Sequence, residues 1–281
     1  MKRATLAAAV VSMACGVGAE LATEDAEVSA GTAYFTAERD QRKCPSPACG
    51  GWWLREVNRT GDAIYVSSLD LSRAGLDDAS LVWNAGPREL LLRGKLRDAE
   101  RGTQKLAVWA AYRGQPNAAP SAADEFLSVA EQNIVCVTAP CERLLATRLN
   151  VGGASRAGKL EVERSCRPFA DDAFMENRVL AHGALVAGRV SGGAVDAGQV
   201  YLRLPLRFAP CPAVKVAKCP DGQVNTWRRT ADLCMIPDGC AAPANCPETR
   251  PACETGYTPS TWPAQPAGCT QLRCDPSFVV P

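Results

Sequence analysis

Residues 44–58, CPSPACGGWWLREVN, recur as residues 136–150, CVTAPCERLLATRLN, at an offset of 92 residues. Each copy holds a Cys-x4-Cys pair, a short apolar run, and an asparagine nine residues after the second cysteine. Other segments repeat in the same order: residues 33–38 correspond to 125–130, 77–80 to 171–174, and 92–96 to 181–185. The near-constant offset indicates that one structural module has been duplicated.

The repeated segments have the pattern of β-strands, because their apolar residues alternate or run in short stretches. We expect a short helix after each Asp-Asp pair, since acidic residues suit a helix N-terminus. The prediction is a mainly β fold in which a five-stranded module, β-β-β-α-β-β, occurs twice and forms a barrel or a sandwich. The expected strands lie near residues 32–39, 52–58, 63–70, 88–97 and 104–113, with partners near 125–135, 142–150, 159–166, 179–190 and 199–208.

The first nineteen residues predict an export signal, with the basic pair Lys2-Arg3 followed by an apolar run too short to span a bilayer. Two processing routes stay open. Val17-Gly18-Ala19 suits ordinary signal peptidase, and residues 11–15 resemble a lipobox in which Cys15 is acylated. Both routes predict an extracytoplasmic protein, either secreted or lipid-anchored to a cell envelope.

Four segments follow from this organisation. Residues 1–19 are the signal peptide, and the acidic residues 20–30 are a flexible spacer. Residues 31–210 form the duplicated β domain, with modules 31–115 and 124–210. Residues 211–281 form a cysteine-rich tail with repeats 211–240 and 246–274.

An exported chain favours disulfides over zinc as the role of its cysteines. The Cys44–Cys49 and Cys136–Cys141 pairs are expected to close equivalent local bridges, and Cys166 is left as the free thiol. A tail repeat of about 30 residues is too small for a core of its own, so disulfides must stabilise it. Three connectivities are possible in each tail set of four: Cys211, Cys219, Cys234 and Cys240, then Cys246, Cys253, Cys269 and Cys274.

Residues 34–58, with the pattern YFTxxRDxRKCxxPxCGGWWxxxVN, resemble the signature of an exported, cysteine-rich bacterial family of domains of unknown function. The resemblance covers residues 31–210. It implies export and β structure, and it implies no catalytic residues. The tail repeats are weakly similar to antistasin-type protease inhibitors.

Few residues suggest chemistry. His182, the one histidine, aligns with Arg93 of the first module and is interpreted as a strand residue bonded to its neighbours. Asp77-Asp78 and Asp171-Asp172 are carboxylate candidates, interpreted as helix starts. With one histidine and cysteines committed to disulfides, the sequence predicts no metal site and no cofactor.

Two other features suggest binding. Trp52-Trp53 could line a carbohydrate surface, although the structural alternative places one ring in the core and the other over an edge or a disulfide. Arg228-Arg229 could form the reactive loop of an inhibitor, and an ordinary solvated loop is the alternative.

The formal net charge of +1 gives no reason to expect a nucleic-acid partner. The sequence therefore predicts a non-catalytic, disulfide-stabilised envelope or secreted protein that acts in binding or structure. Its partner is unknown, an envelope protein or a carbohydrate, and it would touch membranes only through the lipid anchor. The alternatives are a protease inhibitor acting through the tail and, third, a secreted hydrolase.

Overall fold

The computed structural model describes residues 31–45, 48–99, 102–137, 141–165, 170–246 and 252–279. Its contacts divide the chain into residues 1–32 and a compact unit of residues 33–281, with which the following description is concerned. The expected signal peptide, the spacer, Cys15 and Cys166 lie outside the described residues.

Within its described residues, the first module has six strands and one short helix. Buried and less buried side chains alternate along β1 and β2, as expected for a sheet with one face on a core. The elements are β1 (Ala33–Arg39), β2 (Trp52–Glu56), β3 (Ile64–Val66), β4 (Ser68–Asp70), α2 (Ser80–Trp83), β5 (Leu90–Asp98) and β6 (Gln104–Gly114).

The second module repeats this order with a longer helix. Asp171 begins the helix by accepting a hydrogen bond from the Phe174 backbone N–H (3.1 Å), and Gly183 ends it in the left-handed conformation (φ 65°). The elements are β7 (Glu125–Glu131), β8 (Leu144–Arg148), β9 (Ala154–Ala157), β10 (Lys159–Glu161), α3 (Asp172–His182), β11 (Leu185–Ser191) and β12 (Ala194–Leu204).

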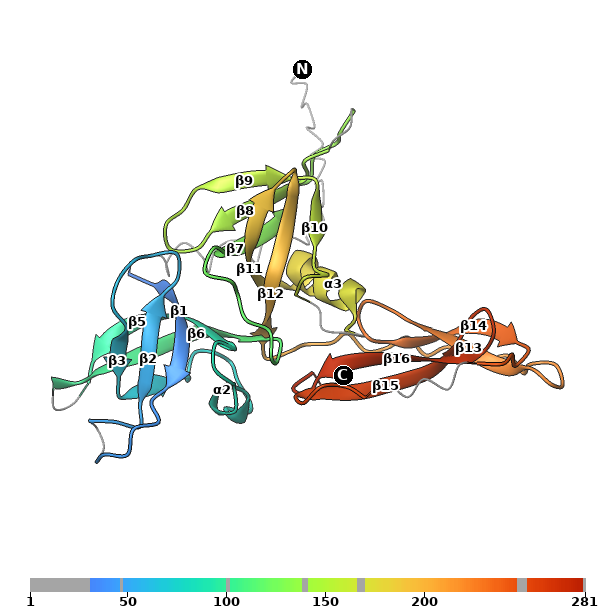
Figure 1. The fold of residues 1–281 in the computed structure, drawn as a ribbon, viewed down its shortest axis with the longest axis horizontal. Helices are drawn as coiled ribbons and strands as arrows, with labels where there is room; N and C mark the ends of the chain where they lie inside the picture. The colour runs from blue at the N-terminus through green and yellow to red at the C-terminus, as the bar shows by residue number, and fades with distance from the viewer. Residues whose placement is uncertain are drawn as a thin grey trace, which may run out of the picture. The chain divides into compact units, whose positions relative to one another are not determined.

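The described strands of both modules join in one 12-stranded sheet in the order β3-β2-β1-β5-β6-β12-β11-β7-β8-β9, with β4 beside β6 and β10 beside β12. Figure 1 shows β1, β2, β3 and β5 side by side in the first module, and β7, β8 and β9 in the second. The fold is therefore mainly β and sandwich-like, and the described strands do not close a barrel.

Two of the expected strands are wrong in extent. The segment expected as one strand near 63–70 is two, β3 and β4, and near 159–166 the chain forms only the short β10, preceded by β9. Each pair of short strands changes partners. β3 pairs with β2 whereas β4 pairs with β6, and β9 pairs with β8 whereas β10 pairs with β12. The break is needed because one strand cannot pair with both of these separated neighbours.

A local twofold axis relates the modules at their junction. β6 and β12 pair antiparallel, and Arg113 lies opposite Leu202. The residues that precede this pair, Tyr112 and Tyr201, are equivalent. Tyr112 lies opposite Leu91, the second residue of β5, and Tyr201 lies opposite Leu185, the first residue of β11. The duplication is thus expressed as symmetric pairing about one residue pair.

The expected equivalence of residues 92–96 with 181–185 is also wrong. The register places Leu92 opposite Phe35 and Val186 opposite Leu127, so Gly94 corresponds to Gly188. Both glycines follow a shift in strand register. A Cβ atom at either position would lie 2.4 Å or 2.3 Å from a backbone oxygen of the next strand, so neither copy can carry a side chain there.

Two apolar clusters are buried. The larger takes side chains from both modules, including Leu54, Leu92, Leu127 and Val186. The smaller lies at the junction, where equivalent residues of the two modules meet. Its buried members are Val57, Leu91, Ala110, Tyr112, Leu149, Leu185, Ala187 and Tyr201, with Tyr34 and Phe126 packed against them.

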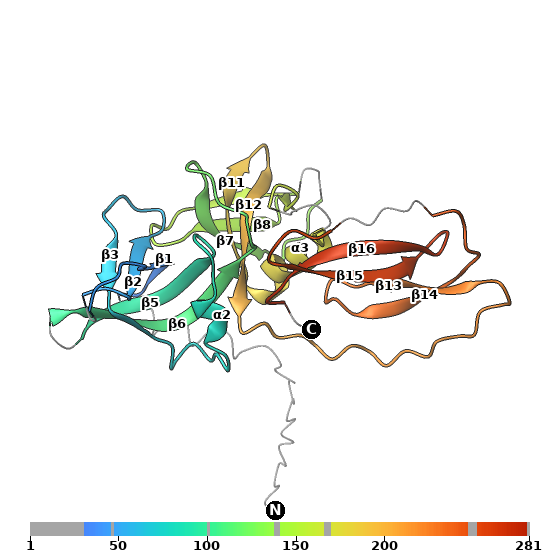
Figure 2. The same ribbon diagram turned by 60° about the horizontal axis from the view of Figure 1, so that its bottom comes forward.

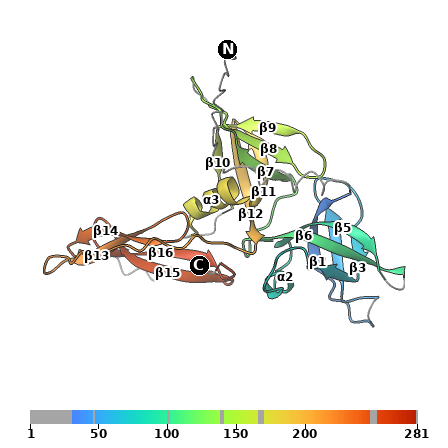
Figure 3. The ribbon, with the colours of Figure 1, turned by 180° about the vertical axis from the view of Figure 1, so that it is seen from behind.

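The tail consists of two antiparallel hairpins, β13 (Val224–Arg229) with β14 (Met235–Ala241), and β15 (Tyr257–Ala264) with β16 (Cys269–Pro276). They lie side by side in Figures 2 and 3. The first cysteine of each repeat bonds to the third and the second to the fourth. The described disulfides are Cys44–Cys49, Cys136–Cys141, Cys211–Cys234, Cys219–Cys240, Cys246–Cys269 and Cys253–Cys274.

Although the bridges stay within each repeat, the tail also contacts the β domain. Leu233, Phe278 and Val279 belong to the larger apolar cluster. The Tyr257 hydroxyl donates to the Pro116 carbonyl (3.1 Å), and the guanidinium of Arg113 lies 4.5 Å from the ring centre of Phe278. The tail is therefore part of the same folded unit rather than an independent appendage.

Candidate functional site

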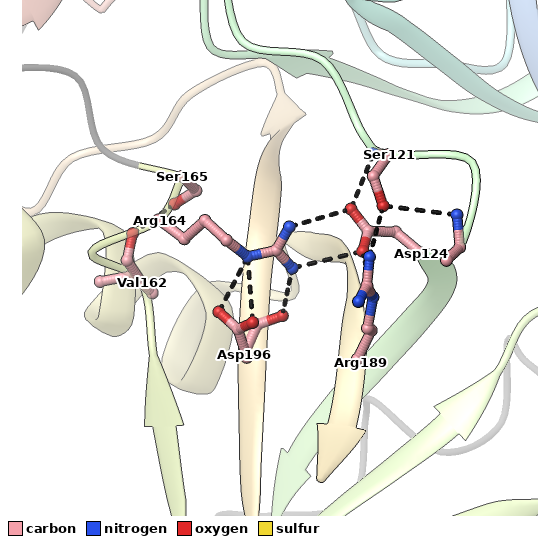
Figure 4. Close-up of polar contacts among 8 residues, drawn as sticks. Ser121, Asp124, Val162, Arg164, Ser165, Arg189 and Asp196 are labelled. Atoms are coloured by element: carbon pink, nitrogen blue, oxygen red, sulfur yellow. Dashed lines mark hydrogen bonds and ion pairs between the residues drawn. The ribbon is translucent and has the colours of Figure 1, made fainter.

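The most concentrated polar cluster surrounds Asp124, at the end of the connector between modules (Figure 4). Its carboxylate is fully buried and accepts hydrogen bonds from Arg164 (3.3 Å), Arg189 (3.1 Å) and the Ser121 backbone (2.8 Å). Burial opposes ionisation, but the hydrogen bonds from Ser121 and Arg164 outweigh it and lower the pKa of Asp124. The group is held as an anion and is not suited to donate a proton.

Arg164 extends the cluster to β12. Its Nε lies 3.0 Å from the carboxylate of Asp196, and its Nη2 donates to the Asp196 carbonyl (3.1 Å). Gly198 leaves room for these groups, because a Cβ there would lie 2.5 Å from Asp124 Oδ2. Farther along the connector, buried Gln199 donates to the carbonyls of residues 115 and 118 (3.0 and 3.1 Å). The cluster thus fixes the connector to β12, and its role is structural.

A second polar arrangement joins the modules reciprocally. Asn58 Nδ2 donates to the carbonyls of Phe126 (2.7 Å) and Leu149 (3.0 Å), and its Oδ1 accepts from the Phe126 N–H (2.8 Å). Asn150 makes the equivalent bonds from the second module to the first. Its Nδ2 donates to the carbonyls of Tyr34 and Val57, and its Oδ1 accepts from the Tyr34 N–H. Both asparagines are left-handed (φ 57° and 62°), a conformation that asparagine tolerates. We call this pair the asparagine latch.

A buried carboxylate contacts the described residues of the first cysteine loop, 41–45 and 48–51. Asp40 accepts three bonds from the Arg42 guanidinium (2.9, 2.9 and 3.0 Å) and one from the Arg42 backbone N–H (3.1 Å). The hydrogen bonds from Arg42 lower the pKa of Asp40 to about 2, against the effect of burial. Arg42 in turn lies over the rings of Trp53 and Tyr65, at 5.1 and 5.6 Å.

The tryptophan pair follows the structural alternative rather than a carbohydrate surface. Trp52 is 3% exposed and packs against Trp83, with ring centres 5.2 Å apart. Trp53 meets Tyr65 edge to face at 5.2 Å and lies beneath Arg42. Neither ring offers the open flat face that stacking on a sugar requires.

The second cysteine loop differs from the first in its exposed side chains. Val135 and Val137 are each 93% exposed and Ile134 is 43% exposed. The loop is tied at its base, where the Gln132 N–H donates to the Arg143 carbonyl (2.7 Å), and by the Cys136–Cys141 disulfide. The sequence signal for this exposed segment is the apolar run Ile134-Val135-Cys136-Val137, which lacks the alternation of a strand with one buried face.

The other candidate residues are placed elsewhere. His182 is not on a strand: it is the last residue of α3, half-exposed, with Nε2 3.6 Å from Asp232. Asp78 lies just before α2 and accepts from the Ser80 N–H (2.8 Å), so both Asp-Asp pairs lie at helix starts. These residues do not bring together the nucleophile, the histidine and the carboxylate that a catalytic triad requires.

The dibasic pair, expected on an exposed loop, lies instead on strand β13. Arg229 is 5% exposed at its side chain and bonds to Asp275 (2.7 Å), with Asp171 at 3.7 Å. Arg228 is exposed but belongs to a paired strand. A protease must hold its target in an extended, accessible loop, and this hairpin does not offer one. The dibasic pair therefore gives no support to the inhibitor alternative, which is left with the resemblance of the tail repeats to antistasin-type inhibitors.

Within the described ranges, no cluster of three or more His, Cys, Asp or Glu side chains could hold a metal ion. No helix in the described part of the chain is long and apolar enough to cross a membrane.

The chain is similar to a described protein family and to a protein of another organism. A model of the family described as a domain of unknown function (DUF6748) matches residues 33–192, the two modules up to the β11–β12 turn. An uncharacterized protein of Dictyostelium discoideum is 20% identical over 256 residues, which cover 88% of each chain. No solved structure matches. The relative comes from a eukaryote, so the bacterial origin implied by the signature stays a prediction.

Proposed function

This chain belongs to the DUF6748 family of domains of unknown function, and from that membership we propose that it is a non-catalytic binding protein of the bacterial cell envelope or the extracellular space. The disulfides support this location, since such bonds persist in oxidising compartments. The basic and apolar segments of residues 1–19 support export, either by cleavage after Ala19 or with Cys15 as the acylated anchor. The ligand class is another protein.

The observation that carries the binding role is the exposure of Val135 and Val137. Burying an aliphatic side chain of this size contributes about 1.5–3 kcal/mol, and here two such side chains remain in water. They also lie on a loop that a disulfide and a backbone hydrogen bond hold in place. A partner would thus gain apolar contact at a small cost in conformational entropy.

The first module provides an internal comparison. At the offset of 92 residues, Arg42 and Lys43 stand where the second module has Ile134 and Val135. Arg42 is used internally, since it bonds to Asp40 and covers Trp53. The apolar residues of the second copy have no such internal contact in the core clusters. The duplicated scaffold therefore supports an outward-facing function at the second loop.

The non-catalytic part of the proposal rests on how the polar groups are used. Asp124, Asp40 and the latch asparagines all bond to groups that hold loops or modules together. Hydrogen bonds, including those from arginine partners, keep the carboxylates of Asp40 and Asp124 ionised, which favours a structural role over proton transfer.

The test compares two double variants of the exported protein. Val135→Asp/Val137→Asp places charge on the proposed surface, whereas Val214→Asp/Val216→Asp changes two tail valines that are 40% and 43% exposed. Each immobilised variant is used to capture partners from envelope and culture extracts, and bound proteins are identified and their affinities measured. We expect the binding free energy of the loop variant to weaken by about 3 kcal/mol or more, which is roughly a hundredfold in affinity. The tail control should bind as the wild type does. Equal binding by both variants would refute the loop as the binding surface.

A further inference from the structure

Three basic side chains form a row on β5. Arg93, Lys95 and Arg97 are spaced two residues apart, so they point to one face of the strand at intervals of about 6.5–7 Å. Leu92 and Leu96, which alternate with them, pack in the larger apolar cluster. The three basic residues therefore lie on the face of β5 that is turned away from this cluster.

A fourth basic residue lies opposite the last of the three. The strand register places Lys105 of β6 opposite Arg97. Opposed residues have Cβ atoms about 4.5–5.5 Å apart, and two like charges at this separation destabilise a sheet. The exposed side chain of Arg97 makes no ion pair with a described residue that would offset the repulsion. We call Arg93, Lys95, Arg97 and Lys105 the basic ridge.

The second module does not repeat this charge. The residues at the four equivalent positions of the strand register are Ala187, Arg189, Ser191 and Ala194. Arg189 is the charged member of this set, and its Nε lies 3.1 Å from the carboxylate of Asp124. The basic ridge is thus specific to the first module, and the shared scaffold does not require it.

The acidic residues beside the ridge do not neutralise it. Asp98 comes directly after Arg97 in β5 and therefore points to the opposite face. Asp70 lies on the neighbouring strand β4, where its carboxylate accepts from the Ser72 hydroxyl (2.7 Å) and backbone N–H (3.2 Å). Residues 100 and 101 of the β5–β6 turn, outside the described ranges, carry one charge of each sign. The face of the hairpin therefore keeps a net positive charge.

The ridge is open to solvent at its outer end. β1 pairs with β5 only over residues 91–94, so no described strand lies beside Lys95 and Arg97 on that side. Both of these side chains are exposed, whereas Arg93 and Lys105 are half-buried. In Figure 2 the end of the β5–β6 hairpin extends beyond β1. A ligand can therefore reach the row of cations from the end of the hairpin.

We propose that the basic ridge binds a linear acidic polysaccharide through carboxylate or sulfate groups on its successive sugars. The proposal goes beyond the proposed function, because it concerns another surface and another class of ligand and does not depend on the second cysteine loop. A polymer with regularly repeated anions matches cations that stand in one row. Its anions also relieve the repulsion between Arg97 and Lys105, so the pair that costs stability in the isolated protein favours the complex.

The shape of the ridge favours a single polymer chain over a membrane. A bilayer presents its charge as a broad surface, and proteins that lie on it commonly add apolar or aromatic side chains that enter the interface. Among the described residues, none of the exposed large apolar side chains lies on β5 or β6. The ridge is also only two strands wide, which suits one chain lying along the hairpin.

The experiment is calorimetric titration of the exported protein carrying Cys15→Ala with polygalacturonate and with heparin, and with uncharged dextran as the negative control. We expect both acidic polymers to bind, with an affinity that falls as salt rises because binding releases counterions. Arg97→Ser/Lys105→Ser should weaken binding about tenfold and make it less sensitive to salt. The matched control, Lys215→Ser/Lys218→Ser, removes the same charge from exposed tail residues and should leave the affinity unchanged.

Arg97→Ser alone gives a second readout. Because this change removes the repulsion with Lys105, the midpoint of its urea unfolding should equal or exceed that of the wild type, while its affinity for the acidic polymers falls several-fold. A lower midpoint would show that Arg97 supports the fold, and would contradict the ridge as a binding feature.

Other results would also overturn the proposal. One is an absence of binding to either acidic polymer at low salt, and another is an equal loss of affinity in the tail control, which would reduce the effect to net charge. Ridge-dependent binding to phosphatidylcholine–phosphatidylglycerol vesicles or duplex DNA, without binding to the polysaccharides, would identify a different polyanion. Binding that appears only after residues 20–30 are removed would show that the chain's own acidic segment occupies the ridge. None of these results bears on protein capture through Val135 and Val137, so the proposed function is tested separately.

Discussion

Replacing either asparagine of the latch should destabilise the protein by an amount that the structure allows us to estimate. Asn58 makes three hydrogen bonds to the second module, at 2.7, 2.8 and 3.0 Å. A net contribution of about 0.5–1.5 kcal/mol for each bond gives a loss of about 1.5–4.5 kcal/mol in the free energy of unfolding. Asn58→Ala should cost about 1 kcal/mol more than Asn58→Gly, because only glycine accepts the left-handed backbone freely.

The assay is urea unfolding of the oxidised, exported protein, followed by tryptophan fluorescence. Asn117→Gly is the matched control, since Asn117 is also left-handed (φ 58°) but makes a single bond, to the Thr255 carbonyl. It should lose about 1 kcal/mol. Asn150→Gly should match Asn58→Gly, and the double variant should lose less than the sum, because both bonds support one inter-module contact. An Asn58→Gly protein within about 0.5 kcal/mol of the wild type would refute the latch.

Four further outcomes are expected. His182→Ala should leave any activity of the protein unchanged, and loss of a turnover reaction by a folded variant would contradict the non-catalytic proposal. Cys15→Ala should abolish palmitate labelling and release the protein from membranes, whereas mature protein that begins at Glu20 would show simple secretion instead. Thiol titration of the denatured, unreduced mature protein should find one thiol, Cys166, and two or none would show that the disulfide assignment is wrong. The pKa of Asp40 is lowered from 3.8 to about 2 in the folded state, so its stabilising effect is present above pH 3.8 and is lost as the pH falls toward 2. The difference in unfolding free energy between wild type and Asp40→Asn should therefore vanish over that range. A difference that stays constant would contradict the pairing with Arg42.

The sequence predicted the duplication and the strands because both leave a local signal. The Cys-x4-Cys pairs, the alternating strands and the two asparagines recur at a fixed offset. The pairing between strands could not be predicted, since the contact of β6 with β12 joins residues far apart in the chain. The same holds for the change of partners between β3 and β4, which no local pattern records.

The misplacement of His182 has a specific cause. The offset between the modules is 92 residues at the cysteine loops and 94 at the Asp-Asp pairs, and the strand register keeps it at 94 for Gly94 and Gly188. The sequence match of residues 92–96 with 181–185 has an offset of only 89, so it aligned Gly94 with Gly183, a helix cap, instead of with Gly188. A glycine is indeed repeated after a shift in strand register in both modules. The sequence alone did not show which glycine of the second module packs against a backbone oxygen of the next strand.

Arg229 was misjudged for a related reason. A dibasic pair is usually solvated, and only the tertiary contacts with Asp275 and Asp171 show that one member is buried. The exposed valines present the opposite case. An apolar run on a hairpin is usually buried, so exposure of Val135 became visible only when the structure showed no surface covering it.

The duplication separates the residues that hold the fold from those that are free to act. Positions where the modules agree, such as Asn58 with Asn150 and Gly94 with Gly188, make contacts that either copy needs in order to fold. Positions where the modules differ cannot be required by the shared scaffold. The first cysteine loop uses Arg42 to close on itself, and the equivalent position in the second loop is apolar and partly open to solvent. Because the scaffold folds with either chemistry at this position, stability does not explain the valines beside it, and we propose that an external partner does.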